Sequence, residues 1–334
     1  MKPEISIIIP AYNLEGLIRA SIVSIIEQDY PNKKIILVDD CSTDGTLTEA
    51  ESVLVNSGVP YKLIRHERNK GVAVARNTGI DAVSGEFFLF FDGDDLCDNN
   101  MLTSLYAACT KHGAPADITV CGHRVYLSDT KETMLFPVKY ISRAGRISAQ
   151  KAATARIKNY FEPSLATLYK TELINRCNVR NYEGCVAGED GEFFLKALVR
   201  AETIESTDTN PYIYIKHPRM GSKKSDRDIR VERYGANANA QARLCDYIKE
   251  HAREKSLIDV VEQMLLPEAL FRLLSYSAMR DDREGFQKIL SETRAATFLK
   301  SWNVITYKPE YFFKGLFLLL APGTYYSHYR KKTP

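Results

Sequence analysis

The sequence of 334 residues lacks the cysteine patterns of zinc sites and of disulfide-rich domains. Its seven cysteines are odd in number, are scattered along the chain and include no Cys-x-x-Cys pair, which indicates reduced thiols. The N-terminus lacks a long apolar segment followed by a small-residue cleavage site, so it does not predict a secretory signal. We therefore expect the protein to stay in the cytoplasm.

The sequence also has little net charge. Its formal net charge is +3, and charged residues make up 26% of the chain. This balance argues against a dedicated nucleic-acid-binding protein. Apolar residues make up 45%, which argues against disorder or a fibrous class. A chain of this length is expected to form one large domain with an appendage, or two domains.

Several common ligand-binding motifs are missing. The sequence contains neither Gly-x-x-x-x-Gly-Lys-Ser/Thr nor Gly-x-Gly-x-x-Gly, so triphosphate hydrolysis and dinucleotide binding lack their usual phosphate-binding loops. An acidic run begins at Asp92, but it is not an EF-hand loop. The positions that need an acid or Asn, a Gly and a Glu hold Leu96, Cys97 and Thr103.

The first hundred residues alternate β-branched runs with helical periodicity. This pattern is typical of βαβ units and a mostly parallel sheet, and it predicts an α/β fold class. Helical periodicity then dominates after about residue 226, where strand signals almost vanish. We predict a first domain over residues 1–225 and a helical C-terminal domain over residues 226–334, separated by a polar segment at 221–228.

The periodicity also predicts individual elements along the chain. The expected strands are 5–9, 35–38, 61–65, 86–91, 118–127, 165–169 and 211–216. The expected helices are 14–30, a helix from 46, 72–83, 100–111, 149–160, 188–200, 228–252, 256–281 and 283–299, with Pro267 as a kink or break.

Polar groups directly follow three of the expected strands. They are Tyr12-Asn13, Asp39-Asp40 and Asp92-Gly93-Asp94-Asp95. Ligands of open α/β sheets bind beyond the carboxyl ends of the strands, so we expect these groups to converge in space.

The carboxylates Asp92, Asp94 and Asp95 can aim oxygens at one point, and hard oxygen ligands suit Mg²⁺ or Mn²⁺. Magnesium usually binds through one or two carboxylates together with substrate phosphates. The cluster therefore predicts a metal that also holds a diphosphate. The alternative is a solvated acidic turn that caps the next helix.

The segment 69–77 places Gly71 just before a helix N-terminus, where free N–H groups and the helix dipole favour anions. Arg76, in the second turn, is within reach of a phosphate or a base. An ordinary surface helix start is the alternative.

Four segments together resemble a known family. They are 7–13 (Ile-Ile-Ile-Pro-Ala-Tyr-Asn), 37–46 (Leu-Val-Asp-Asp-Cys-Ser-Thr-Asp-Gly-Thr), 71–77 and 91–95. In this order they resemble the family 2 inverting glycosyltransferases of the GT-A fold, of the type that builds bacterial cell-surface polysaccharide or lipopolysaccharide. The resemblance is dense to about residue 110, thinner to about 222, and absent afterwards. It implies a Rossmann-like sheet flanked by helices.

The resemblance implies a role for each matching residue. The nucleotide-binding residues would be Pro10, Tyr12, Asp39, Asp40, Arg76 and Asp94, and the metal ligands Asp92, Asp94 and Asp95. The base would usually be uridine, and the metal Mn²⁺ or Mg²⁺. Cys41 stands where the family often has Gly or Asn, so we expect a local backbone difference there rather than lost binding.

Gly188-Glu189-Asp190-Gly191-Glu192 resembles the family's segment that carries the catalytic base, with Asp190 at the matching position. A carboxylate suffices there because the acceptor hydroxyl becomes more acidic as it attacks. The alternative is that Glu189 and Asp190 only favour the first helical turn through its dipole.

Downstream, His217 is a candidate metal ligand or a structural histidine, and Arg219 or Lys223 would neutralise the leaving diphosphate.

The apolar segment 311–321 is too short to cross a bilayer, which needs about 20 residues. With Tyr325, Tyr326, Tyr329 and the basic residues after them, it is expected to lie in a membrane interface. The alternative is packing on the preceding helices or on a second subunit.

Together the resemblance implies an inverting, metal-dependent transfer from a UDP-sugar to a hydroxyl of a glycan or lipid-linked acceptor. The partners would include no nucleic acid, with peripheral contact on the inner face of the cell membrane and a homo-oligomer also open. The alternatives are a sugar nucleotidyltransferase, which this chain's lack of a Gly-rich N-terminal loop disfavours, and a non-catalytic nucleotide-sugar-binding module.

Overall fold

The computed structural model describes residues 2–160, 162–185, 187–217, 226–292, 317–318, 320–330 and 332. The chain forms two compact units. The first comprises residues 1–152, 159–184 and 200–219, and the second comprises 153–158, 185–199 and 220–334. The domain boundary at residues 225 and 226 stays a prediction.

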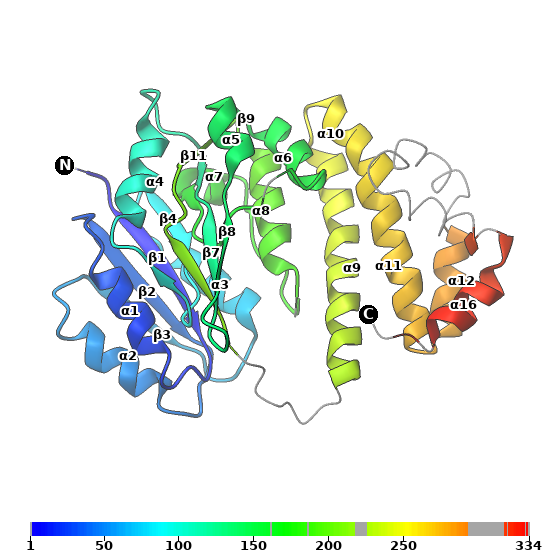
Figure 1. Cartoon of the computed structure of the whole chain (residues 1–334), viewed down its shortest axis with the longest axis horizontal. Helices are drawn as coiled ribbons and strands as arrows, with labels where there is room; N and C mark the ends of the chain where they lie inside the picture. The colour runs from blue at the N-terminus through cyan, green and yellow to red at the C-terminus, as the bar shows by residue number, and fades with distance from the viewer. Residues whose placement is uncertain are drawn as a thin grey trace. The chain divides into compact units, whose positions relative to one another are not determined.

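An eight-stranded sheet forms the centre of the first unit (Figure 1), in the order β3-β2-β1-β4-β10-β6-β11-β9. Strands β3, β2, β1 and β4 are parallel, and β10 is antiparallel to both of its neighbours. The strands are β1 Ile5–Ala11, β2 Lys33–Asp39, β3 Tyr61–Arg65, β4 Phe87–Phe90, β6 Ile118–Val120, β9 Ile147–Ser148, β10 Leu168–Lys170 and β11 Thr203–Ser206. The predicted α/β fold class is confirmed.

Helices cover both faces of the parallel strands. The alternate residues Ile5, Ile7 and Ile9 of β1 belong to a core shared with α1 (Ile18–Ile26), α2 (Thr46–Leu54) and α4 (Met101–Thr110). On the other face, α3 (Val72–Asp81) packs so closely that a Cβ on Gly79 would lie 2.2 Å from Ile8 Cγ2. All seven residues of β1 are buried, as a continuous apolar run predicts for a strand covered on both faces.

A second, four-stranded sheet has the order β5-β12-β7-β8. Its strands are β5 Leu96–Cys97, β7 His123–Leu127, β8 Thr133–Phe136 and β12 Tyr212–Lys216. The prediction of a single strand over 118–127 is therefore wrong, because the chain passes from one sheet to the other at Gly122. The Gly122 N–H donates to Thr209 O at 3.2 Å, and a Cβ there would lie 1.9 Å from Asn210 Oδ1.

Several short elements have no clear signal in the sequence. They are β5, β8, β9, β11, α5 (Lys139–Ala144) and α7 (Thr171–Arg176). All four residues of β8 (Thr-Met-Leu-Phe) are exposed. The strand therefore has no buried face, and its sequence does not alternate apolar with polar residues. Strand β11 contains Glu205, a buried carboxylate with His112 Nε2 at 3.2 Å, which hides the apolar pattern of an inner strand.

The second unit is helical. Its described helices are α8 Glu189–Arg200, α9 Asp226–His251, α10 Lys255–Val260, α11 Leu266–Met279, α12 Arg283–Glu292 and α16 Pro322–Arg330, and α6 Ala149–Ile157 is shared with the first unit. A π-helical turn, Val261–Leu265, joins α10 to α11. Pro267 therefore lies directly after this π-helical turn, at the start of α11. The part of the predicted helix 283–299 after Glu292 lies outside the described residues.

The C-terminal tyrosines correct part of the membrane prediction. Tyr325 is fully buried and Tyr326 is 9% exposed, in a cluster with Phe271, Leu274 and Phe286. These two side chains pack on α11 and α12, as the bundle alternative predicts, because the ring area is removed from water there. Residues 311–316 lie outside the described residues. No described helix is long and apolar enough to cross a membrane.

Candidate functional site

The acidic turn follows β4 directly, as predicted. Asp92, Asp94 and Asp95 each offer one carboxylate oxygen, and these oxygens lie within 4.8 Å of one another. Gly93 lets the turn approach α1, since a Cβ there would lie 2.8 Å from side-chain atoms of Leu14 and Ile18. The sequence thus brings three carboxylates to one point at the carboxyl end of a buried strand.

Asp95 is the most constrained of the three carboxylates. It is fully buried, and it accepts hydrogen bonds from the Tyr212 hydroxyl and from the Ile215 N–H, the latter at 2.8 Å. Burial raises the pKa of Asp95 to about 8, although both hydrogen bonds act in the opposite direction. Both donors belong to β12, so Asp95 ties the acidic turn to the second sheet.

Asp92 is paired with Arg76, which the sequence placed in a separate motif. Arg76 Nη2 lies 3.1 Å from Asp92 Oδ1, and the Arg76 side chain is 4% exposed. The guanidinium also lies over the Phe90 ring, 5.7 Å from its centroid. Helix α3 therefore brings a buried positive charge beside the carboxylates. A phosphate held by a metal at these carboxylates would also pair with a positive charge.

The surroundings of Asp94 fit a divalent cation. Burial, followed by the charge of Asp92, raises the pKa of Asp94, while His217 acts to lower it. Within the described part of the chain, His217 Nε2 is buried without a hydrogen-bond partner. Crowded carboxylates next to an unpartnered imidazole nitrogen are groups that a cation would stabilise. Arg219 and Lys223 lie outside the described residues.

Asp40 organises the start of α3. Its Oδ1 accepts from the Lys70 N–H at 2.9 Å and lies 2.7 Å from His66 Nδ1, and its Oδ2 accepts from the Gly71 N–H at 2.7 Å. Gly71 has a φ of +89°, which a residue with a Cβ would adopt only under strain. His66 was not predicted, because nothing in its local sequence indicates a partner 26 residues away.

Asp39 and Cys41 shape the turn after β2. Asp39 is fully buried, accepts from the Ser42 N–H at 3.1 Å, and lies 3.2 Å from Arg65 Nε. Cys41 has a φ of +64°, in the left-handed region that Gly and Asn adopt more readily. The turn thus takes a conformation that costs more energy with Cys than with Gly or Asn.

The loop after β1 presents Tyr12, which is 45% exposed, while Pro10 is buried. Four consecutive N–H groups, of residues 13–16, donate to side-chain oxygens of the β2–α2 region at 2.6 to 3.1 Å. The acceptors are Ser42, Thr46, Asp44 and Glu49. These hydrogen bonds fix the backbone of the loop, so the exposed Tyr12 ring stands on a rigid support.

Asp190 belongs to the second unit. It lies exposed in the first turn of α8, and its Oδ1 accepts from the Gly191 N–H at 2.7 Å. The same turn contains Glu192, which is 3% exposed and lies 2.6 Å from Lys196 Nζ and 2.7 Å from Arg243 Nη2. The sequence analysis did not predict this buried ion cluster, since Arg243 is 51 residues away. It holds the start of α8 in place and leaves Asp190 open to solvent.

Comparison with known proteins identifies relatives of this fold. Residues 6–175 match the family model described as glycosyl transferase family 2. The chain is 32% identical over 223 residues to the uncharacterized glycosyltransferase EpsJ of Bacillus subtilis, covering 65% of this chain and 62% of EpsJ. It is 28% identical over 236 residues to cholesterol galactosyltransferase of Borreliella burgdorferi, covering 68% and 64% of the two chains. The chain thus spans less than two thirds of the length of these relatives.

A shorter match is with WfgD of Escherichia coli, a UDP-Glc:alpha-D-GlcNAc-diphosphoundecaprenol beta-1,3-glucosyltransferase, at 43% identity over 98 residues, or 29% of this chain and 38% of WfgD. Among solved structures, TarS 1–349 of S. aureus in complex with UDP-GlcNAc has a TM-score of 0.71 at 21% identity, covering 98% of this chain and 89% of the 1–349 chain. Mannosyltransferase PcManGT from Pyrobaculum calidifontis, in complex with GDP-Man and Mn²⁺, has a TM-score of 0.56 at 18% identity, covering 97% and 87%. These two likenesses show a shared fold.

Proposed function

Since the chain belongs to glycosyl transferase family 2, we propose that it transfers a sugar from a UDP-sugar to a hydroxyl of a glycan or lipid-linked acceptor. The observation that carries this proposal is the convergence of Asp92, Asp94, Asp95 and the buried Arg76 at the end of β4. Carboxylates that suit a divalent cation and a fixed guanidinium are the groups that a nucleoside diphosphate requires. The WfgD relative, named for a UDP-sugar donor, supports uridine as the base.

On the donor side, Asp92 and Asp94 would hold Mn²⁺ or Mg²⁺, with His217 as a further ligand. When bound, such an ion supplies positive charge beside the diphosphate leaving group. Arg76, which is paired with Asp92, would add a fixed positive charge on the same side. Tyr12 would lie against the uracil, and Asp39 and Asp40 would shape the turn and loop that enclose the base and ribose. Asp95, bonded to β12, would mainly keep the acidic turn in register.

On the acceptor side, Asp190 would act as general base. Its carboxylate takes the proton of the acceptor hydroxyl while that oxygen forms a bond to the anomeric carbon. The bond from that carbon to the diphosphate oxygen breaks, and the diphosphate leaves with the electron pair. A single displacement of this kind inverts the anomeric configuration through an oxocarbenium-like transition state. A product that keeps the donor's configuration would contradict this mechanism.

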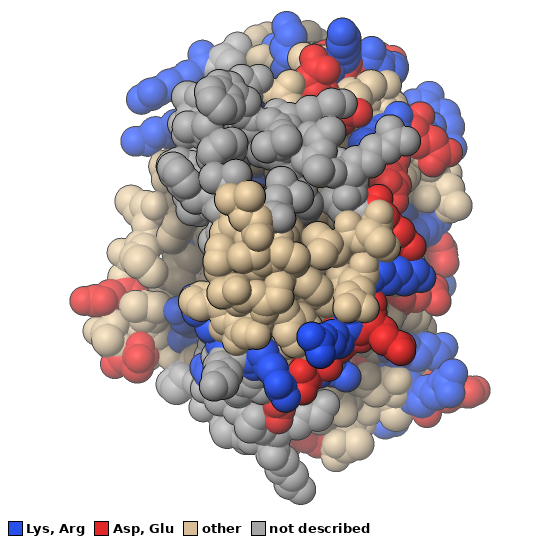
Figure 2. Space-filling view, turned by 90° about the vertical axis from the view of Figure 1, so that its right-hand side faces the viewer, with Lys and Arg blue, Asp and Glu red and all other residues tan. Residues whose placement is uncertain are grey.

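We also propose a place of action at the inner face of the cell membrane, in cell-surface polysaccharide synthesis. The relative named for an undecaprenol-linked acceptor supports a lipid-linked substrate. Figure 2 shows an area of uncharged residues with charged residues below it and to its right. Phe317 and Leu320, 38% and 76% exposed, supply apolar area for such a contact. A second copy of the chain is the other partner that this surface suits.

A thermal-shift titration tests the donor assignment directly. A ligand that binds only the folded chain at a hundred times its Kd stabilises it by about 2.7 kcal/mol. We expect UDP to raise the melting temperature in the presence of Mn²⁺ or Mg²⁺, and to raise it much less after EDTA treatment. The comparison nucleotides are GDP and ATP. No metal-dependent shift with any nucleotide would overturn the proposal.

A further inference from the structure

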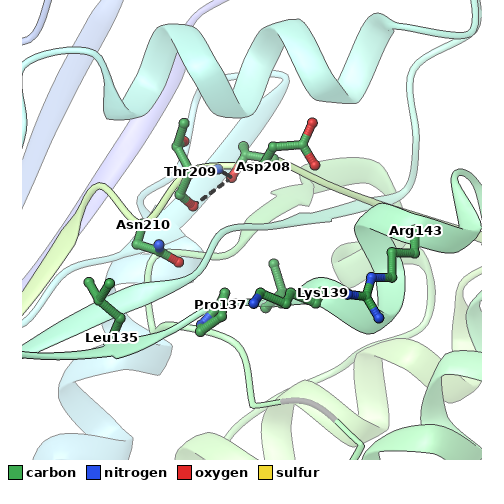
Figure 3. Close-up of a pocket in the computed structure, with 9 residues that line it drawn as sticks. Leu135, Pro137, Lys139, Arg143, Asp208, Thr209 and Asn210 are labelled. Carbon is green, nitrogen blue, oxygen red and sulfur yellow. Dashed lines mark hydrogen bonds between the residues drawn. The ribbon is translucent and has the colours of Figure 1, made fainter.

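A cavity of about 570 Å³ lies in the first unit, and no residue of the motifs above lines it. Strand β8 and helix α5 form one side of it, and the loop between β11 and β12 forms the other (Figure 3). Its polar lining consists of Lys139, Arg143, Thr207, Asp208, Thr209 and Asn210. The sequence analysis did not predict this cavity, because its two sides are about seventy residues apart in the chain.

The cavity lies at the sheet edge that carries the donor motifs. Strand β11 is parallel to β6, and both run in the direction of β4, because β10 between them is antiparallel to β4 and to β6. The loop that begins at Thr207 therefore leaves the sheet at its carboxyl edge. Strand β11 stands three places from β4, which is about 14 Å at the usual strand spacing. A group held at the end of β4 would not reach the cavity, so a different part of a substrate would be needed to fill it.

The same loop is linked to the acidic turn. Asn210 is followed after one residue by β12, whose Tyr212 and Ile215 donate to Asp95. The Asp98 N–H donates to Pro211 O at 2.9 Å, next to Asn210. The cavity wall and the carboxylate cluster are therefore held in one fixed arrangement within the first unit.

The charges around the cavity lack ion-pair partners within the described part of the chain. Lys139 and Arg143 lie four residues apart on α5, and Figure 3 shows both on the same side of the cavity. Asp208 lies across from them, beside Thr209. The two cations and the carboxylate are all exposed. The site thus offers two positive charges, one carboxylate, and the neutral hydrogen-bonding groups of Thr209 and Asn210.

We propose that this cavity binds a phosphate-bearing sugar of the acceptor, an assignment that rests on the proposed transferase function and deepens it. A phosphate monoester carries a charge of about −1.5 to −2 at neutral pH, which matches Lys139 and Arg143 together. The guanidinium binds two phosphate oxygens side by side. Sugar hydroxyls donate to the Asp208 carboxylate and exchange hydrogen bonds with the Asn210 amide. Leu135 and Pro137, both exposed, line the cavity and offer an apolar surface for the ring.

The test is a calorimetric titration of the full chain saturated with UDP and Mn²⁺, so that the donor site is occupied. The probes are glucose 1-phosphate and N-acetylglucosamine 1-phosphate, each compared with its neutral sugar and with inorganic phosphate. We expect each phosphosugar to bind at least tenfold more tightly than the neutral sugar, and the difference to shrink in 0.5 M NaCl. Equal affinity for the phosphosugars and the neutral sugars would overturn the proposal.

Three variants complete the experiment. The double variant Lys139→Gln, Arg143→Gln should reduce phosphosugar affinity about tenfold or more. The matched control Lys62→Gln, Lys111→Gln removes two exposed charges elsewhere in the first unit and should leave it unchanged. Asp208→Asn should weaken phosphosugar binding and leave inorganic phosphate unaffected or stronger. Unchanged phosphosugar affinity in the Lys139, Arg143 double variant, with an unchanged melting temperature, also defeats the assignment.

The two proposals fail separately in this design. A chain that binds UDP with Mn²⁺ but does not discriminate between phosphosugars and neutral sugars overturns the acceptor assignment alone. A chain that shows no metal-dependent UDP binding overturns the proposed function, and the comparison between the unchanged chain and the Lys139, Arg143 double variant still reports on the cavity.

Discussion

The residues of the proposed donor site and those of the proposed acceptor side differ in how their polar atoms are bonded. At the ends of β1, β2 and β4, the oxygens of Asp40 and Asp95 and four consecutive N–H groups are already bonded within the protein. Lys139, Arg143 and Asp208, by contrast, are exposed charges without ion-pair partners in the described part of the chain, and Asp190 is exposed too. A fixed donor site suits a ligand that is always the same nucleotide, because a preorganised site loses little order on binding. An open acceptor side suits ligands that differ from one protein to the next.

The strongest way to break this comparison is to remove Asp190, the proposed base, without changing the proposed donor site. Asp190→Asn should lower the transfer rate about 10²- to 10⁴-fold, the usual contribution of a general base. The UDP-dependent thermal shift with Mn²⁺ should survive. Product formation from a radiolabelled UDP-sugar measures the first effect. Glu189→Gln, one residue away in the same turn, is the control and should retain most activity, and an Asp190→Asn variant with full transfer would remove Asp190 from the mechanism.

A smaller effect is expected at the proposed metal site. Asp94→Asn removes a carboxylate charge from a proposed cation ligand, and we expect about tenfold to hundredfold weaker UDP binding in Mn²⁺, the range of one charge-assisted interaction. UDP binding measured in EDTA should hardly change. The difference between the two conditions is therefore the readout. If Asp94→Asn weakened binding equally with and without metal, the residue would contact the nucleotide rather than the ion.

Tyr212→Phe probes whether Asp95 is chiefly a structural carboxylate. The change removes the hydroxyl that donates to Asp95 and leaves a buried oxygen with one partner fewer. We expect a loss of about 1–3 kcal/mol in the free energy of unfolding, measured by urea denaturation. Tyr214→Phe, at an exposed position of the same strand, serves as control. A stable Tyr212→Phe chain would mean that the link between the two sheets contributes little.

Cys41→Gly should have the smallest effect, and in the opposite direction. Glycine relieves the positive φ of this residue, worth about 1–2 kcal/mol, and loses part of that gain to the greater freedom of the unfolded chain. We expect a net stabilisation of about 0.5 kcal/mol in denaturant titration, with UDP affinity unchanged. A destabilised variant would show that the Cys41 side chain contributes contacts that outweigh the strain.

The sequence predicts the parts of the molecule that depend on neighbours along the chain. The buried run of β1, the helix periodicity of α1 and α8, and the acidic turn after β4 all carry their signal within a few residues. Contacts between distant segments have no such signal. Tyr212 and Asp95 are 117 residues apart, and Arg243 and Glu192 are 51 apart. Both pairs bury a carboxylate, and the local sequence around either residue does not indicate its partner.

The β11–β12 loop shows what this architecture permits over evolutionary time. Asp208, Thr209 and Asn210 line the cavity, so replacing them would change the groups that a ligand there meets, whereas the buried Thr207 hydroxyl bonds with the Thr209 backbone and holds the loop. Changing the number of residues in the loop is a different matter. A one-residue shift along β12 turns every side chain to the opposite face of the sheet, and Tyr212 would then point away from Asp95. A change of loop length that shifted β12 would therefore break the contact with Asp95, whereas substitutions at the exposed positions 208 and 209 would leave that contact intact.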